Sequence, residues 1–290
     1  MIDREPLLDI RLVAMDLDGT LLNREKEISA GNQRALIECE TRGILVVPAT
    51  GRSRPAVSAL ARYYGLTSPM ISINGARVDL SPTGPSLLKD IFDRERAEKA
   101  FRILKESGVY FVVYCRDTLY RVNLDLHPEE QNRGLSKNAV RIENEMGFGC
   151  RVEVVVDDRR AWDEGLEDTY KMVVFCRDEQ RIQAVRAQLE MEMDMALSSS
   201  WSDNLEVLMP GAGKGRAIER LQQHYGLRRD QIMAFGDFSN DLEMLSAAGW
   251  PVAMGNAIDE VKAAAKIIAP NNDDDGVGYV LNKYVLGEYE

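Results

Sequence analysis

The sequence contains no run of 18 consecutive apolar residues, so we expect no transmembrane helix. Its first nine residues are acidic and polar and lack the basic start and apolar centre of a signal peptide, which favours a cytoplasmic location. The four cysteines, at positions 39, 115, 150 and 176, lie far apart and show no C-x-x-C spacing. Reduced thiols are therefore expected rather than a disulfide framework.

Basic residues are in the minority. The chain has 36 Lys and Arg against 47 Asp and Glu, a formal net charge of −11. This balance argues against a broad surface for nucleic acid or an anionic membrane. A phosphate site is still compatible with it, because a bound divalent cation and one lysine can reverse the local field. The 290 residues, 45% of them hydrophobic, suffice for one large or two ordinary domains.

Apolar strands alternate with helices in the first 76 residues. Strands are expected at 10–14, 44–49 and 70–73, with helices at 29–42 and 55–65 between them. Continuously apolar strands are typical of sheets that are buried on both faces. The pattern predicts an α/β fold with a doubly wound parallel sheet.

The pattern changes after a turn-rich linker at 81–85. Helices are expected at 93–107 and 181–191, and strands at 109–115, 119–122, 152–156 and 170–176. We therefore predict that residues 83–192 form an inserted α+β module. The first pattern resumes with short strands at 196–201 and 204–208, so residues 193–290 are predicted to complete the core begun by residues 1–82.

Two carboxylates, Asp16 and Asp18, follow the first strand directly. Side chains at i and i+2 of an extended chain point to the same side. Two like charges at such a short distance are unfavourable unless a cation or a shared proton compensates them. The carboxyl ends of strands in α/β sheets are where such sheets bind ligands, so this pair indicates a functional site.

Three further groups of polar residues are predicted at the same edge. Thr50, Gly51 and Arg52 follow the second strand, Lys214 begins a helix, and Asp237, Asn240 and Asp241 follow a strand at 231–235. Together with the first pair, they resemble the four motifs of the haloacid dehalogenase superfamily of phosphotransferases. The position of the insert between the second and third motifs is similar to that in Cof-type phosphatases, whose cap is an α+β module. Gly213, before Lys214, departs mildly from the small polar residue common there.

The resemblance implies a chemistry for the motif residues. Asp16 would be the nucleophile that forms an aspartyl phosphate, and Asp18 the general acid and base. Lys214, Thr50 and Gly51 would bind the phosphoryl group. Mg²⁺ would be held by Asp16, the backbone carbonyl of Asp18 and Asp237. Asn240 and Asp241 would orient the metal or Lys214 without contacting the substrate. Asn74, Gly75 and Arg52 are candidate substrate contacts.

The resemblance therefore implies a Mg²⁺-dependent phosphatase of a small phosphorylated metabolite, such as a sugar phosphate or a phosphorylated cofactor. A phosphomutase and a phospho-ligand sensor without turnover remain alternatives. A dinucleotide-binding oxidoreductase is disfavoured because no G-x-G-x-x-G follows the first strand. A Walker loop is also disfavoured, because the run Gly211 to Gly215 lacks the spacer and the Ser or Thr that this motif requires. The sequence does not indicate an oligomeric state.

Overall fold

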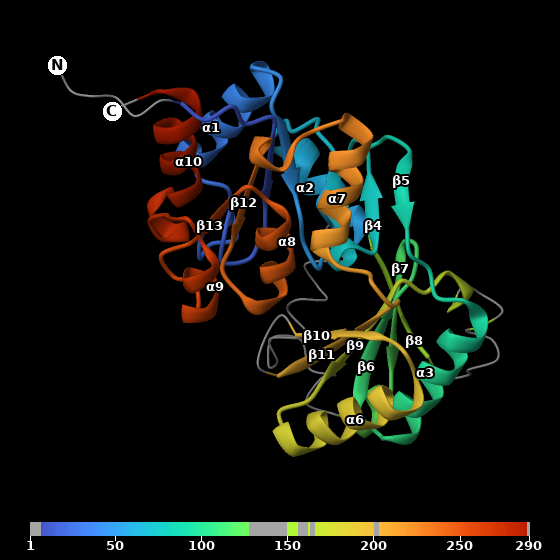
Figure 1. The fold of residues 1–290 in the computed structure, drawn as a ribbon. Helices are drawn as coiled ribbons and strands as arrows, with labels where there is room; N and C mark the ends of the chain where they lie inside the picture. Colours follow the sequence, from blue (N-terminus) through green and yellow to red (C-terminus); the bar gives the residue numbers. More distant parts are fainter. Residues whose placement is uncertain (1–6, 128–149, 156–161, 163–165, 200–202, 289–290) are drawn as a thin grey trace. The chain divides into compact units, whose positions relative to one another are not determined.

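The computed structural model describes residues 7–127, 150–155, 162, 166–199 and 203–288 (Figure 1). The chain divides into two compact units. The first contains Met1–Thr50, Leu60–Leu88 and Gly213–Glu290, and the second contains Gly51–Ala59 and Lys89–Ala212. The domain bounds given above stay a prediction, although the structure places two strands near the second boundary differently.

The first unit is built on a five-stranded sheet in the order β14-β13-β12-β1-β2. These strands are β1 (Leu12–Met15), β2 (Leu45–Pro48), β12 (Ile232–Gly236), β13 (Trp250–Ala253) and β14 (Ile267–Ile268). Every neighbouring pair is parallel. The accompanying helices are α1 (Ala30–Thr41), α7 (Lys214–Tyr225), α8 (Leu242–Ala247), α9 (Asp259–Ala264) and α10 (Gly276–Leu281), while α2 (Arg54–Tyr63) is divided between the units. The predicted α/β fold with a parallel sheet is confirmed.

Strand β1 lies between β12 and the edge strand β2. All residues of β1 and β12 are buried, as expected for strands covered on both faces. The chain leaves β1 toward β2 on one side and later adds β12 on the other. The carboxyl end of β1 is thus a topological switch point, where open α/β sheets bind their ligands.

The third predicted strand does not join this sheet. The structure instead has a separate three-stranded sheet of β3 (Met70–Ser72), β4 (Arg77–Asp79) and β5 (Ser86–Lys89). Strands β3 and β4 pair antiparallel, and a single parallel bridge, Ala49 with Ile71, links β3 to the end of β2. The strand predicted at 70–73 is confirmed as β3. Its place as a full member of the parallel sheet was wrong, because this one bridge joins it to β2 and the residues that follow the reversal pair back onto β3.

The second unit contains a six-stranded sheet in the order β10-β11-β9-β6-β7-β8. Its strands are β6 (Tyr110–Tyr114), β7 (Thr118–Val122), β8 (Arg151–Val154), β9 (Lys171–Phe175), β10 (Ala196–Ser198) and β11 (Asn204–Leu208). Helices α3 (Arg94–Glu106) and α6 (Glu179–Glu192) lie beside this sheet (Figure 1). Their apolar side chains share one buried core with it.

Strands β10 and β11 were expected to resume the pattern of the first unit, and this expectation was wrong. Strand β11 pairs antiparallel with β9, and β10 pairs antiparallel with β11. All five residues of β11 are buried. Short apolar strands carry no local signal of which sheet they join, so only the partner strand β9 decides their place.

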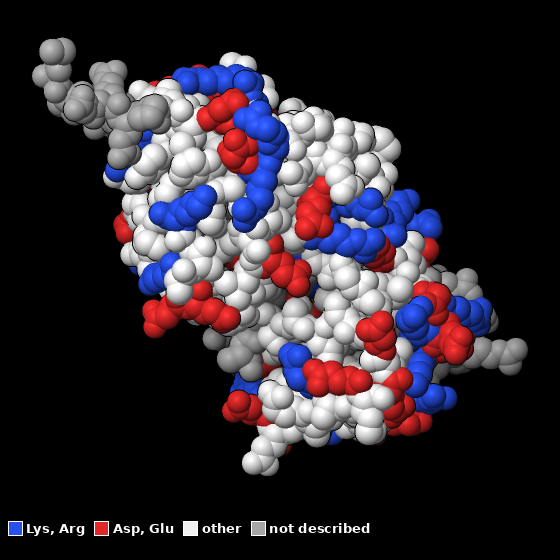
Figure 2. Space-filling view, viewed as in Figure 1, with Lys and Arg blue, Asp and Glu red and all other residues white. Residues whose placement is uncertain are grey.

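The remaining expectations concern surface and membrane. Within the parts of the chain that the structure describes, no helix has the length and apolar character needed to cross a membrane. On the face shown in Figure 2, Lys and Arg side chains lie among Asp and Glu side chains. Most of the polar stretch from 127 to 150 lies outside the described residues.

Candidate active site

Four charged side chains of the first unit meet at the switch point: Asp16, Lys214, Asp237 and Asp241, which we call the Asp–Lys cluster. Asp16 follows β1, and its backbone N–H donates to the carbonyl of Phe235 in β12 at 3.1 Å. Because Met15 lies opposite Phe235 in this parallel pair, the residues that follow the two strands emerge at one edge. Asp16 and Asp237 are therefore brought together by strand register.

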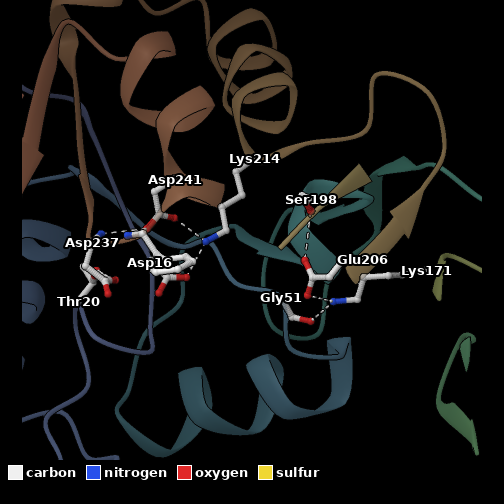
Figure 3. Close-up of polar contacts among 10 residues, drawn as sticks. Asp16, Thr20, Gly51, Lys171, Ser198, Glu206, Lys214, Asp237 and Asp241 are labelled. Carbon is white, nitrogen blue, oxygen red and sulfur yellow. Dashed lines mark hydrogen bonds and ion pairs between the residues drawn. The ribbon is translucent and has the colours of Figure 1, made fainter. Parts of the chain in front are cut away.

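Lys214 joins two of the carboxylates. Its Nζ donates to Asp16 Oδ1 at 2.6 Å and to Asp241 Oδ1 at 2.7 Å (Figure 3). Lys214 is the first residue of α7 and only 1% of its side chain is exposed. A buried ammonium group requires such partners, since an unpaired buried charge is strongly unfavourable.

Asp241 and Thr20 hold the loop that carries Asp237. Asp241 Oδ2 accepts the backbone N–H groups of Asp237 at 3.0 Å and Phe238 at 3.3 Å. The hydroxyl of Thr20 donates to Asp237 Oδ1 at 2.8 Å. Gly19 has a φ of 91°, and a Cβ at this position would lie 2.4 Å from Asp237 Oδ2. The carboxylate of Asp237 is thus fixed by the loop after β1 and by its own loop.

Burial and crowding determine the electrostatics of the cluster. Burial raises the pKa of Asp16 to about 8; Lys214 opposes this shift, and Asp241 and Asp237 add to it. Burial, followed by repulsion from Asp241, raises the pKa of Asp237 to about 7. Burial alone would lower the pKa of Lys214, but Asp16 and Asp241 outweigh it and raise that pKa above its ordinary value. Negative charge in the cluster is therefore only partly compensated.

The cluster has the composition of a divalent cation site. Oxygen atoms of Asp16, Asp237 and Asp241 all lie within 4.8 Å of one another. Three ionised carboxylates and one ammonium group leave a formal charge of −2, which one divalent ion would balance. Carboxylate oxygens are hard donors that suit Mg²⁺. The donor set therefore fits the metal that the resemblance implies. Both oxygens of Asp241 already accept hydrogen bonds, Oδ1 from Lys214 and Oδ2 from the backbone of Asp237 and Phe238, so Asp241 supports the other two carboxylates.

Two other motif residues lie at the rim of the cluster. Asp18 Oδ1 accepts from Lys26 Nζ at 2.8 Å, and the Asp18 side chain is 26% exposed. Asn240 lies in the short 3-10 helix Ser239–Asp241 and is half-buried. The predicted roles of both residues, including a backbone carbonyl of Asp18 as a metal ligand, stay predictions.

Thr50 and Asn74 lie together at the neighbouring strand ends. The N–H of Ala49 donates to the carbonyl of Met15 at 2.8 Å, so Thr50 and Asp16 follow residues that are hydrogen-bonded to each other. Thr50 is 2% exposed, and its carbonyl accepts the N–H of Asn74 at 2.9 Å. Gly75, the third residue of this group, packs against the backbone of residues 213 and 214.

Gly51 and Arg52 belong to the second unit, where Gly51 contacts a buried ion pair. Lys171 Nζ donates to the Gly51 carbonyl at 2.9 Å and lies 3.3 Å from Glu206 Oε1 (Figure 3). Both charged side chains are fully buried. Ser198 donates its hydroxyl to Glu206 Oε2 at 3.3 Å, and the Lys171 ammonium lies 4.6 Å from the ring centroid of Tyr114.

Sequence reasoning missed two residues that hold the loop after Asp18. Lys26 has a φ of 64° and forms the ion pair with Asp18. Asn256 donates to the carbonyl of Gly19 at 2.8 Å and accepts the N–H of Asn272 at 3.0 Å. No spacing in the sequence signals these contacts. They depend on how two loops meet at the sheet edge.

Comparison with known proteins identifies the class. The family model of haloacid dehalogenase-like hydrolases matches residues 13–281, so the chain belongs to this family. The chain is similar to the 5-amino-6-(5-phospho-D-ribitylamino)uracil phosphatase YwtE of Bacillus subtilis, at 33% identity over 97% of this chain and 100% of that protein. The resemblance to Cof-type phosphatases that the motifs indicated is confirmed.

Solved structures agree with this assignment. A haloacid dehalogenase-like hydrolase from B. subtilis is 28% identical, with a TM-score of 0.80 over 94% of this chain and 99% of that one. The protein TM0651 from Thermotoga maritima is 31% identical, with a TM-score of 0.76 over 94% and 97%. The chain is a phosphatase of the haloacid dehalogenase superfamily that acts on phosphorylated small molecules.

The buried pair in the second unit yields a stability prediction. Lys171→Met should lower the free energy of unfolding by about 3–5 kcal/mol, because Glu206 is left buried without its cation. Urea denaturation measures the loss. The double variant Lys171→Met/Glu206→Leu should recover most of it, since well-packed apolar groups can replace a buried ion pair at little cost.

The exposed pair Arg94–Glu98 provides the control. Glu98→Gln should change the free energy of unfolding by less than about 0.5 kcal/mol, because exposed pairs on helices contribute little. A single variant Lys171→Met that is as stable as Glu98→Gln would show that Glu206 does not depend on Lys171 as its buried cation.

Proposed function

We propose that the protein is a Mg²⁺-dependent phosphatase that hydrolyses a small phosphorylated metabolite, a sugar phosphate or a phosphorylated cofactor, through an aspartyl phosphate on Asp16. The observation that carries this proposal is the buried Lys214 ammonium held between Asp16 and Asp241 beside Asp237. It combines a nucleophile, a cation for the transferring group and a set of metal-binding oxygens in one place.

The first half-reaction transfers the phosphoryl group to the protein. A carboxylate oxygen of Asp16 attacks phosphorus, and the bond from phosphorus to the ester oxygen breaks. Asp18 gives its proton to the departing oxygen, so the product leaves as a neutral alcohol. Lys214 and the Thr50 hydroxyl compensate the charge that spreads over the phosphoryl oxygens.

The second half-reaction regenerates Asp16. Asp18, now ionised, accepts a proton from water, and the water oxygen attacks phosphorus of the acyl phosphate. The bond between phosphorus and the Asp16 oxygen breaks and releases inorganic phosphate. Two steps with moderate barriers replace the direct hydrolysis of a monoester, whose uncatalysed rate requires accelerations of up to about 10²¹-fold.

Asp16 and Asp237, together with the backbone carbonyl of Asp18, are the groups with which this chain would hold Mg²⁺, and Asp241 would support them. When bound, the ion supplies charge neutralisation for the phosphoryl oxygens. The residues around it keep the ligands in place: Thr20 holds Asp237, and Lys214 holds Asp16 and Asp241.

The relatives narrow the substrates to test. YwtE, YcsE and YitU of B. subtilis, which are 28–33% identical, are named 5-amino-6-(5-phospho-D-ribitylamino)uracil phosphatases. A relative from Escherichia coli, 25% identical, is named a pyridoxal phosphate phosphatase. A panel should therefore contain phosphorylated ribitylamino-pyrimidines, pyridoxal phosphate and sugar phosphates, with phosphate release as the readout.

Removal of the nucleophile tests the proposal. Asp16→Asn should lower kcat on the best substrate of the panel by about 10³-fold or more, because an amide oxygen does not form the aspartyl phosphate. The matched control is Asp9→Asn, a surface aspartate paired with Arg11, which should retain wild-type turnover.

Retained turnover in Asp16→Asn would remove Asp16 as the nucleophile. Formation of an isomeric phosphate ester without phosphate release would identify a phosphomutase. Tight binding of a panel member by the wild-type protein, with no reaction, would identify a phospho-ligand sensor.

Mg²⁺ should stabilise the protein more at pH 8.5 than at pH 6. Folding raises the pKa of Asp16 and Asp237 above the ordinary value, to about 8 and about 7. The stability that these two groups contribute to folding is full below pH 3.8, their ordinary pKa, and is lost progressively as the pH rises to about 7 and about 8. Ionised carboxylates bind Mg²⁺, so at pH 8.5 Mg²⁺ at 100 times its Kd should add about 2.7 kcal/mol. Proton competition should reduce this gain at pH 6.

Thermal unfolding with and without Mg²⁺ at the two pH values measures this difference. In Asp237→Asn the gain should shrink at both pH values, because one ligand and one negative charge are missing. An equal Mg²⁺ effect at pH 6 and 8.5, or an undiminished effect in Asp237→Asn, would show that the ion binds elsewhere.

A further inference from the structure

The turn after β3 has an unusual backbone. Ile73, Asn74 and Gly75 have φ values of 54°, 53° and 92°, so three consecutive residues lie in the left-handed region. Glycine adopts this region freely and asparagine tolerates it, but a β-branched residue such as isoleucine rarely does. All three residues are buried. Backbone strain of this kind persists only where the surrounding structure holds it, and it concentrates at functional sites.

One end of the turn is attached to Thr50. The N–H of Asn74 donates to the Thr50 carbonyl at 2.9 Å, and the N–H of Thr50 donates to the carbonyl of Ile71 at 3.0 Å. These two bonds tie the residue proposed to contact the phosphoryl group to both sides of the strained segment.

The other end of the turn presses on the start of α7. A Cβ at Gly75 would lie 2.1 Å from the Gly213 carbonyl oxygen and 2.7 Å from the backbone nitrogen of Lys214. These are backbone atoms, which cannot rotate aside as the end of a flexible side chain can. Gly75 therefore allows an approach that no other residue permits.

The start of α7 is also confined from its opposite side. A Cβ at Gly215 would lie 2.8 Å from the backbone carbonyl oxygen of Glu243 in α8. The backbone of Lys214 thus lies between the turn and α8. A bulkier residue at position 75 would displace Lys214 from its present position, because α8 leaves the start of α7 no room to move away from the turn.

We infer that Gly75 is a positioning residue for Lys214: its missing side chain lets the strained turn set the start of α7, and with it the place of the ammonium group between Asp16 and Asp241. The same turn holds Thr50, so it determines the spacing of the two groups proposed to bind the phosphoryl group. The catalytic consequence rests on the proposed function, whereas the structural consequence for Lys214 does not.

Chemical labelling of Lys214 tests the structural consequence without reference to activity. In wild-type protein with Mg²⁺, the buried ammonium should react slowly with acetic anhydride, relative to the exposed Lys89. In Gly75→Ala the labelling of Lys214, measured by mass spectrometry of its peptide, should rise at least about tenfold, because protection is lost when the local structure opens more easily. Lys89 should be unchanged.

Gly43→Ala is the matched control. Gly43 has a φ of 76°, close to that of Gly75, but a Cβ there would meet nothing within 4 Å. This variant adds left-handed backbone strain without a clash, so Lys214 labelling and turnover should stay within about twofold of wild type.

Kinetics test the catalytic consequence. Gly75→Ala should lower kcat by about 10- to 100-fold, because misplacing a catalytic group by about 1 Å can cost 100-fold. In a Lys214→Met background the same substitution should cost less than it does in the wild-type background, since Lys214 is already missing and only the effect on Thr50 remains. If Gly75→Ala lowers kcat by the same factor in both backgrounds, the two substitutions act independently and the inference is contradicted.

The outcomes are separable. Wild-type Lys214 labelling in a folded Gly75→Ala variant overturns the inference, whatever the activity. A wild-type protein that releases no phosphate from the panel overturns the proposed function, and the labelling result still decides the role of Gly75. If Gly75→Ala does not fold, Asn74→Ala replaces it: alanine disfavours the left-handed turn without adding a clash, and Lys214 labelling should rise less but measurably. Unchanged labelling in that variant overturns the inference.

Discussion

The hydrogen-bonded ion pairs that Lys214 makes with Asp16 and Asp241 are the interaction on which the rest of the site depends. Three carboxylates with oxygens within 4.8 Å of one another could not all stay ionised in a buried position without positive charge. One ammonium group provides part of it and leaves the charge for which a divalent ion is suited.

This contact joins residues 198 positions apart in the chain. The parallel sheet makes it possible, because β1 and β12 end at the same edge and deliver Asp16 and Asp237 side by side. Helix α7 then brings its first residue to that edge. Local loops complete the arrangement: Asp241 caps the loop of Asp237, and Thr20 reaches it from the loop after β1. Strand register determines the site, and hydrogen bonds between loops refine it.

The residues that could be predicted from the sequence are those whose position follows from a strand or helix end. Asp16, Thr50 and Asp237 each come after an apolar run, and Lys214 opens an amphipathic helix, so their convergence followed from the topology. The sheets that β3, β10 and β11 join could not be predicted, because short buried strands pair according to tertiary partners that periodicity does not reveal. Lys26 and Asn256 were missed for a related reason: each acts across a contact between loops.

The conformation of the turn at Gly75 could be predicted from the sequence only in part. An asparagine followed by glycine signals a turn, but the isoleucine before them argues against positive φ at three successive positions. The structure adopts this conformation because β3 and the start of α7 hold the turn from both ends. Phosphoryl transfer depends mainly on placing charges at fixed distances. A strained turn between Thr50 and Lys214 is therefore consistent with a site whose chemistry depends on rigidity more than on the number of its contacts.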